Sequence, residues 1–191
     1  MTEKSGSWKA QLWSIVLLIV VLAMAIEIFL LVKENRKLLA ALSAPRGPFK
    51  ILNPAERVPP FAGIDLSGKE VKVEYPSSQK TVLFWFSVGC PSCEHNLEFW
   101  KEVCRKYNSA KFRFFGATNS EAKETDEFAK KFQLEFPIVM VSDQSLLEKY
   151  KVEVIPQTML IDANGVVLKV WPGPLSDSYK KEIEEMLSSS P

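Results

Sequence analysis

The segment that most restricts the architecture of this 191-residue chain is the apolar run "LWSIVLLIVVLAMAIEIFLLV", from Leu12 to Val32. These 21 residues carry a single charge, Glu27. At about 1.5 Å per residue, a helix of this length covers the hydrocarbon core of a bilayer, which is about 30 Å thick. No polar face interrupts the run, as one would in a helix buried in a soluble core. The sequence therefore predicts a transmembrane helix over residues 12–32, preceded by a short tail, residues 1–11.

A cleaved signal peptide is the alternative explanation for this segment. Its apolar stretch is about 7–15 residues long and is followed by a cleavage site of small residues. Here the run is longer, and the charged sequence "KENRK" follows it directly. We therefore predict an uncleaved anchor. Basic residues flank the run on both sides, so charge alone leaves its orientation in the membrane open.

Residues 33–57 are predicted to connect the anchor to a folded domain. The sequence "KENRKLLAALSA" has helical propensity and is expected to extend the anchor helix by about two or three turns. The sequence "PRGPFKILNPAERVPP" then carries five prolines, which end a helix and favour an extended chain. The folded domain is predicted over residues 58–191.

The composition excludes several functional classes. The formal net charge is +1 and the basic residues form no stripe, so nucleic acid is not expected as a partner. Three cysteines are too few for a disulfide-stapled secreted scaffold. A single histidine excludes a metal centre that is built from several histidines.

Strand-like and helix-like segments alternate from Phe61 to the end of the chain. The run "TVLFWFS" is continuously apolar between Thr81 and Ser87, as in a strand that is covered on both faces. The order β-α-β-α-β, followed by a hairpin and a helix, predicts an α/β domain whose mixed sheet carries helices on both faces. The predicted elements are a hairpin over 63–73, strands over 81–87, 111–119 and 136–142, helices over 91–107, 120–133 and 144–150, a hairpin over 157–171 and a helix over 176–187.

Cys90 and Cys93 form a C-x-x-C pair at the point where a predicted strand ends and a predicted helix begins. At a helix N-terminus, unpaired backbone N–H groups and the helix dipole favour a negatively charged sulfur, and the thiolate is the species that attacks a disulfide. Pro91 suits the first helical position, where the missing N–H costs no hydrogen bond. One helical turn places Cys93 beneath Cys90, within bonding reach. The pattern predicts thiol–disulfide exchange, with Cys90 as the exposed nucleophile and Cys93 as the resolving thiol.

Two other roles for the pair have less support. A disulfide that only braces a four-residue loop stabilises little, because the entropic benefit grows with loop length. A metal site would recruit Cys90, Cys93, His95 and Cys104, but zinc usually takes four ligands from two pairs, and there is no second C-x-x-C or histidine pair. We therefore expect no metal and no other cofactor. Cys104 lies on the apolar stripe of the helix and is expected to be buried and inert.

The segments "FWFSVGCPSC" and "VIPQTMLIDANGVV" resemble the two signatures of the thioredoxin superfamily. The opening "VPPFAGIDLSGKEVKV" is similar to the "P-x-F-x-x-x-D-x-x-G-K-x-V" start of the redoxin group. From Val58 to about Leu187 the chain resembles membrane-anchored TlpA-like and ResA-like thiol–disulfide oxidoreductases. The resemblance implies a thioredoxin-like three-layer α/β/α fold with a mixed central sheet. It also implies that Ile155–Pro156 is a cis peptide facing the dithiol, and that Ile155 offers backbone hydrogen bonds to a bound substrate.

Three positions depart from the pattern of this family. Gly89 stands where many relatives have a tryptophan, Phe84 where thioredoxin has a buried aspartate, and Gln157 where some cytochrome-maturation relatives have a glutamate. The carboxylate that usually moves protons to and from the second cysteine is therefore not identified. Pro91, Ser92 and His95 are the candidates for tuning the reduction potential of the pair.

These features together predict a membrane-anchored enzyme that exchanges disulfides with partner proteins. The resemblance implies a domain on the extracytoplasmic (periplasmic) side of the cell membrane, a part in redox homeostasis and in cytochrome or metalloenzyme maturation, and an upstream electron donor or acceptor that the sequence does not identify. Two alternatives remain open. A peroxiredoxin-like peroxidase carries P-x-x-x-[ST]-x-x-C, which Ser87 fits but Leu83 does not. A non-catalytic module would hold a metal or an apoprotein on the same fold.

Overall fold

The computed structural model describes residues 5–43, 49–107 and 111–189, and the chain forms two compact units, Met1–Pro48 and Phe49–Pro191. The first unit is the helix α1 (Ser5–Ser43), which contains a stretch, Leu12–Arg36, that is long and apolar enough to cross a membrane. The helix starts within the predicted tail and continues through the first part of the predicted connector. Residues 1–4 of that tail and residues 44–48 of that connector lie outside the described residues.

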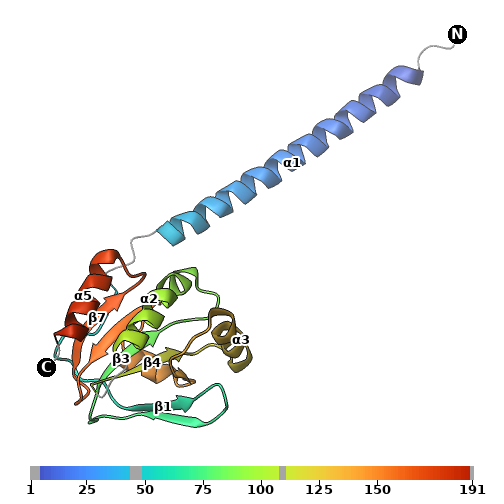
Figure 1. Ribbon diagram of the computed structural model, residues 1–191. Helices are drawn as coiled ribbons and strands as arrows, with labels where there is room; N and C mark the ends of the chain where they lie inside the picture. The colour runs from blue at the N-terminus through green and yellow to red at the C-terminus, as the bar shows by residue number, and fades with distance from the viewer. Residues whose placement is uncertain (1–4, 44–48, 108–110, 190–191) are drawn as a thin grey trace. The chain divides into compact units, whose positions relative to one another are not determined.

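The second unit is built on a mixed sheet of seven strands in the order β2-β1-β5-β4-β3-β6-β7 (Figure 1). The central strand β3 (Lys80–Trp85) pairs in parallel with β4 (Phe112–Thr118) and antiparallel with β6 (Gln157–Ile161). The other strands are β1 (Phe61–Ile64), β2 (Glu70–Val73), β5 (Ile138–Met140) and β7 (Val167–Pro172), and the helices are α2 (Pro91–Tyr107), α3 (Ala122–Phe132), α4 (Gln144–Lys149) and α5 (Asp177–Ser188).

Side chains of β3 and of Phe86, which follows it, alternate between two separate cores, one on each face of the sheet. Val82, Phe84 and Phe86 pack with buried residues of α2, α3 and α5. Leu83 and Trp85 pack with residues of α4 and with the segment that leads into β1. Because successive side chains of a strand point to opposite faces, an entirely apolar strand requires cover on both sides. The predicted α/β/α layers and mixed sheet are confirmed.

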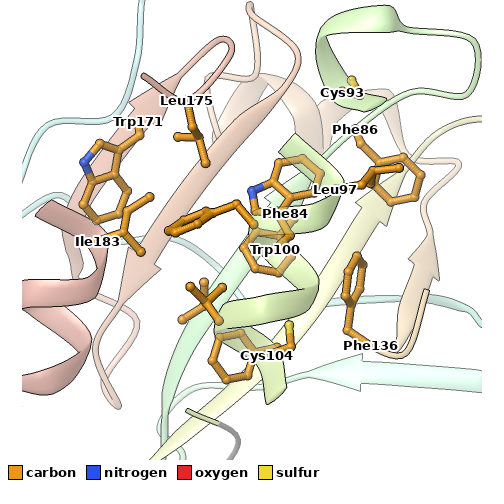
Figure 2. Packing of buried hydrophobic residues seen from close by; sticks show 14 of the residues in the cluster. Phe84, Phe86, Cys93, Leu97, Trp100, Cys104, Phe136, Trp171, Leu175 and Ile183 are labelled. Atoms are coloured by element: carbon orange, nitrogen blue, oxygen red, sulfur yellow. The ribbon is translucent and has the colours of Figure 1, made fainter. Parts of the chain in front are cut away.

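Helix α2 is held on the sheet by one aromatic side chain in particular. The Trp100 ring stacks on Phe84, with 4.7 Å between ring centroids, and its Nε1–H donates to Thr158 Oγ1 at 3.0 Å. Figure 2 shows Trp100 and Phe84 in the middle of this core, with Cys93 and Cys104 toward opposite ends of α2. Contacts with both β3 and β6 therefore set the position of the helix that begins at the cysteine pair.

The packed unit begins earlier than the sequence analysis placed it. Leu52 is 3% exposed and belongs to the core on the α4 side of the sheet. The Ala55 N–H donates to Val167 O at 2.9 Å, and the Val167 N–H donates to Glu56 O at 2.8 Å. Residues 49–57, assigned from their prolines to the connector, are therefore part of the compact unit and pair with the start of β7.

Candidate active site

Cys90 and Cys93 lie together where the chain passes from β3 into α2. The carbonyl of Cys90 accepts the backbone N–H groups of Cys93 (2.9 Å) and Glu94 (3.1 Å), which places Cys90 at the N-terminus of the helix. Pro91 occupies the first helical position. The Cys93 N–H lies 3.3 Å from Cys90 Sγ, and both cysteines are free thiols. The Cys90 sulfur thus faces a backbone N–H at the N-terminal end of the helix.

The two thiols differ sharply in their surroundings. Cys90 is half-buried, whereas Cys93 is fully buried in the core beneath α2. Burial, and after it the contact with the Cys90 sulfur, raises the pKa of the Cys93 thiol to about 12, and the backbone of Ser87 offsets only part of this. Cys93 therefore keeps its proton at neutral pH, and of the pair only Cys90 has access to solvent.

The loop before Cys90 is shaped by a glycine and by a serine that follows the neighbouring strand β4. Gly89 has φ +74°, a left-handed conformation that side-chain-bearing residues adopt at a cost, so this backbone suits glycine. The Val88 N–H donates to Ser120 Oγ at 3.1 Å. Ser120 follows β4, whose carboxyl end lies beside that of β3 because the two strands are parallel. Ser120 was not predicted from the sequence, since nothing local marks a serine after a strand as a loop anchor.

Ile155 and Pro156 lie at the same edge of the sheet as the two cysteines. The peptide bond between them is cis. Pro156 precedes Gln157, which pairs with Trp85 at the end of β3, so β6 starts where β3 leads into the cysteine loop. Ile155 and Cys90 are both partly buried and pack against the same core. Antiparallel pairing thus places Ile155 and Pro156 at the end of the sheet where the cysteine loop begins.

The predicted tuning residues lie in the first turns of α2. Pro91 and His95 are exposed and Ser92 is half-buried. Gln157 is fully buried, and alternation along β6 places it on the face opposite to Thr158, which bonds to α2 through Trp100. An amide at this position therefore faces away from the helix that carries Cys93.

Cys104, the most distant of the four residues that the disfavoured metal site would recruit, lies far from the cysteine pair along α2. Cys104 follows Cys93 by eleven residues on α2, which corresponds to roughly 16 Å along a helix. Burial raises the pKa of its thiol to about 12, which suits an inert core residue. Within the described residues, no three histidine, cysteine, aspartate or glutamate side chains form a group that could hold a metal ion.

A dithiol at a helix N-terminus, on a mixed sheet covered by helices on both faces, defines a redox protein of the thioredoxin fold. The solved thioredoxin domain of a thiol-disulfide oxidoreductase from Bacteroides vulgatus superimposes with a TM-score of 0.63 at 17% identity, covering 71% of this chain and 99% of that domain. At this level of identity the likeness concerns the fold alone.

The sequence comparisons then identify the family. The pattern of the AhpC/TSA family matches residues 54–170, more than half of the chain, so the chain belongs to this family. The thiol-disulfide oxidoreductase ResA of Geobacillus thermodenitrificans (strain NG80-2) is 30% identical over 132 residues, which make up 69% of this chain and 74% of that protein. The sporulation thiol-disulfide oxidoreductase A of Bacillus subtilis (strain 168) is 27% identical over 124 residues, 63% of this chain and 74% of that protein. The chain is thus a thiol–disulfide oxidoreductase of the ResA type.

Proposed function

We propose that this chain is a membrane-anchored enzyme that exchanges disulfides with partner proteins through Cys90 and Cys93. One observation carries the proposal: a half-buried sulfur at a helix N-terminus receives a backbone N–H at 3.3 Å, while its partner thiol is buried and protonated. This asymmetry gives each cysteine a separate role. Cys90 is the nucleophile and Cys93 is the resolving thiol.

In the reducing direction, the Cys90 thiolate attacks one sulfur of a client disulfide. A Cys90–client mixed disulfide forms, and the other client sulfur leaves as a thiolate. Cys93 then gives up its proton to the leaving thiolate, and its sulfur attacks Cys90. The second client thiolate is released, the Cys90–Cys93 disulfide forms, and two electrons have passed to the client. The oxidising direction is the same sequence in reverse.

The backbone of Ile155 is proposed to bind the extended client segment around its cysteine. Ile155 is partly buried, lies at the same sheet edge as Cys90 and precedes the fully paired strand β6. A client strand that bonds to this backbone would have its disulfide held near the Cys90 sulfur. Pro91, Ser92 and His95 surround the pair on the first turns of α2 and are proposed to set its reduction potential.

The helix α1 is proposed to anchor the enzyme in the cell membrane, with the domain on the extracytoplasmic side. The length and apolar character of Leu12–Arg36 support the anchor, and the resemblance to anchored oxidoreductases supports the side. Clients on that side would include apocytochromes or metalloenzymes whose cysteines must be reduced before maturation.

Fusion of alkaline phosphatase after Pro191 tests on which side of the membrane the domain lies. An active phosphatase is expected, and an inactive fusion at normal protein level would place the domain in the cytoplasm.

Activity is tested on the full chain in detergent, with insulin as the disulfide substrate and dithiothreitol as the reductant. Cys90→Ser is expected to lower the rate by roughly a thousandfold or more, because no other residue supplies the nucleophile. With dithiothreitol removed before insulin is added, reduced Cys93→Ser is expected to accumulate a mixed disulfide between Cys90 and insulin, visible by mass spectrometry, because the resolving step is lost. Full activity of the Cys90→Ser chain would refute the assignment.

A redox titration of the Cys90–Cys93 pair gives the direction of exchange. A potential near that of thioredoxin, about −270 mV, identifies a reductant, and one near about −120 mV identifies an oxidant.

Peroxidase activity is tested with hydrogen peroxide as the substrate in place of insulin. Leu83, where peroxidases carry proline, lies inside β3 and pairs with strands on both sides, a position that excludes proline. Slow peroxide turnover is therefore expected, and fast turnover would favour a peroxidase.

A further inference from the structure

Asn96 is a fully buried polar residue that the exchange reaction does not use. It lies on α2, one turn after Cys93, and is 0% exposed. An amide buried in a protein interior costs free energy unless it is hydrogen-bonded. Its partners therefore indicate what this position holds in place.

The Asn96 side chain bonds to the backbone of the loop between β7 and α5. The Leu175 N–H donates to Asn96 Oδ1 at 2.8 Å, and Asn96 Nδ2 donates to Gly173 O at 3.3 Å. A backbone N–H needs the amide oxygen and a backbone carbonyl needs the amide nitrogen, so both bonds require the same orientation of the side chain. The two partners lie 79 and 77 residues further along the chain.

Gly173, which bonds to Asn96, also bonds to the segment that contains Ile155 and Pro156. Its N–H donates to Pro156 O at 2.7 Å, and its φ of +79° is one that favours glycine. Pro172, which pairs with Gln157 at the end of β7, has no N–H to donate. Gly173 therefore supplies the backbone donor at this end of the ladder, and its carbonyl is held by Asn96.

We propose that Asn96 is a positioning residue, which holds the Ile155–Pro156 segment in a fixed place relative to Cys90. The chain of bonds runs from α2 through Asn96 and Gly173 to Pro156. This inference rests on the proposed function, because it assumes that a client docks on the backbone of Ile155. Loss of Asn96 releases Gly173, so the docking segment is no longer aligned with the attacking sulfur. A small reagent that needs no docking still meets the same Cys90.

The test compares insulin reduction with the alkylation of Cys90, both measured on the full chain in detergent. Asn96→Ala is expected to lower kcat/KM for insulin reduction about tenfold, as the loss of aligned hydrogen bonds would do. Alkylation of Cys90 by iodoacetamide is expected to stay within about twofold of the wild-type rate, because that reaction depends on the thiolate alone. Asn96→Asp keeps the acceptor for Leu175 but sets a carboxylate against the Gly173 carbonyl. A similar loss for insulin is expected from it.

Val103→Ala is the matched control, since it removes core methyl groups from the same helix without touching this network. It is expected to lower stability and to leave the ratio of the two rates unchanged. Unchanged insulin kinetics in both Asn96 variants would overturn the inference, as would an equal fall of both rates. Should Asn96→Ala fail to fold, Asn96→Asp alone decides. A wild-type chain without insulin reductase activity would instead refute the proposed function, so the two failures are distinguishable.

Discussion

At the scale of single residues, three cysteines of one helix region occupy three different environments. Cys90 lies half-buried at the helix N-terminus, Cys93 is buried one turn below it, and Cys104 is buried near the other end of α2. For the two buried thiols, loss of solvation is the main cause of the raised pKa. The same chemical group therefore serves as a nucleophile, a protonated partner and a core side chain, according to its distance from solvent and from the helix end.

The raised pKa of Cys104 predicts a loss of stability in alkali. Burial raises the pKa of this thiol from its ordinary value of 9.0, which holds in the unfolded chain, to about 12 in the folded one. Its stabilising contribution is therefore complete below pH 9 and is lost as the pH rises toward 12. We expect the urea midpoint to fall less between about pH 8 and about pH 10.5 in Cys104→Ala than in wild type, both measured under reducing conditions.

Comparing the fall of the urea midpoint in the two chains removes the contributions of tyrosines and lysines, which both chains share. Val103→Ala is again a suitable control, because it perturbs the same core without removing a titrating group. A fall of equal size in Cys104→Ala and wild type would show that the Cys104 thiol ionises in the folded chain.

At the scale of secondary-structure elements, the attachment of α2 to the sheet depends on the Trp100–Thr158 contact. Trp100→Phe preserves most of the stacking on Phe84 but leaves the buried Thr158 hydroxyl without its donor. We expect a loss of about 1–3 kcal/mol in the free energy of unfolding, measured by urea denaturation. Adding Thr158→Val to Trp100→Phe should restore part of this loss, because the unpaired hydroxyl is then gone. If Thr158→Val instead lowered the stability of the Trp100→Phe chain by as much as it lowers that of the wild-type chain, the Trp100–Thr158 hydrogen bond would contribute nothing.

At the scale of the whole molecule, the boundary between anchor and domain is decided by packing. A chain that starts at Phe49 keeps Leu52 and the backbone bonds of Ala55 and Glu56 to Val167. A chain that starts at Val58 loses all of them and exposes part of the core on the α4 side of the sheet. We expect the longer fragment to be more stable by at least about 2 kcal/mol in urea denaturation, the lower end for deleting a buried leucine. Equal stabilities would show that residues 49–57 belong to the connector.

Local patterns in the sequence were enough to predict most elements and the cysteine pair. The apolar run, the continuous apolar strand β3 and the helical spacing of α2 each reflect a period or a length that neighbouring residues define. The C-x-x-C at a strand-to-helix junction is equally local, since the helix end itself supplies the backbone N–H groups. The cis state of the Ile155–Pro156 bond came from the family resemblance, because only a small share of such bonds are cis and no local signal selects them.

The remaining features arise from contacts between segments far apart in the chain. Ser120 accepts a hydrogen bond from the cysteine loop across two parallel strands, and Leu52 packs in the core on the α4 side of the sheet. Asn96 bonds to Gly173, which lies 77 residues further along the chain. An asparagine in a helix pattern reads as a solvated polar residue, and only the folded chain shows it buried and bonded on both sides. The sequence by itself determined which segments are apolar helix, strand or cysteine-bearing helix end, because these depend on neighbouring residues. The tertiary structure alone decided which polar side chains hold the site together, because hydrogen-bond partners are chosen by the packing of the whole sheet.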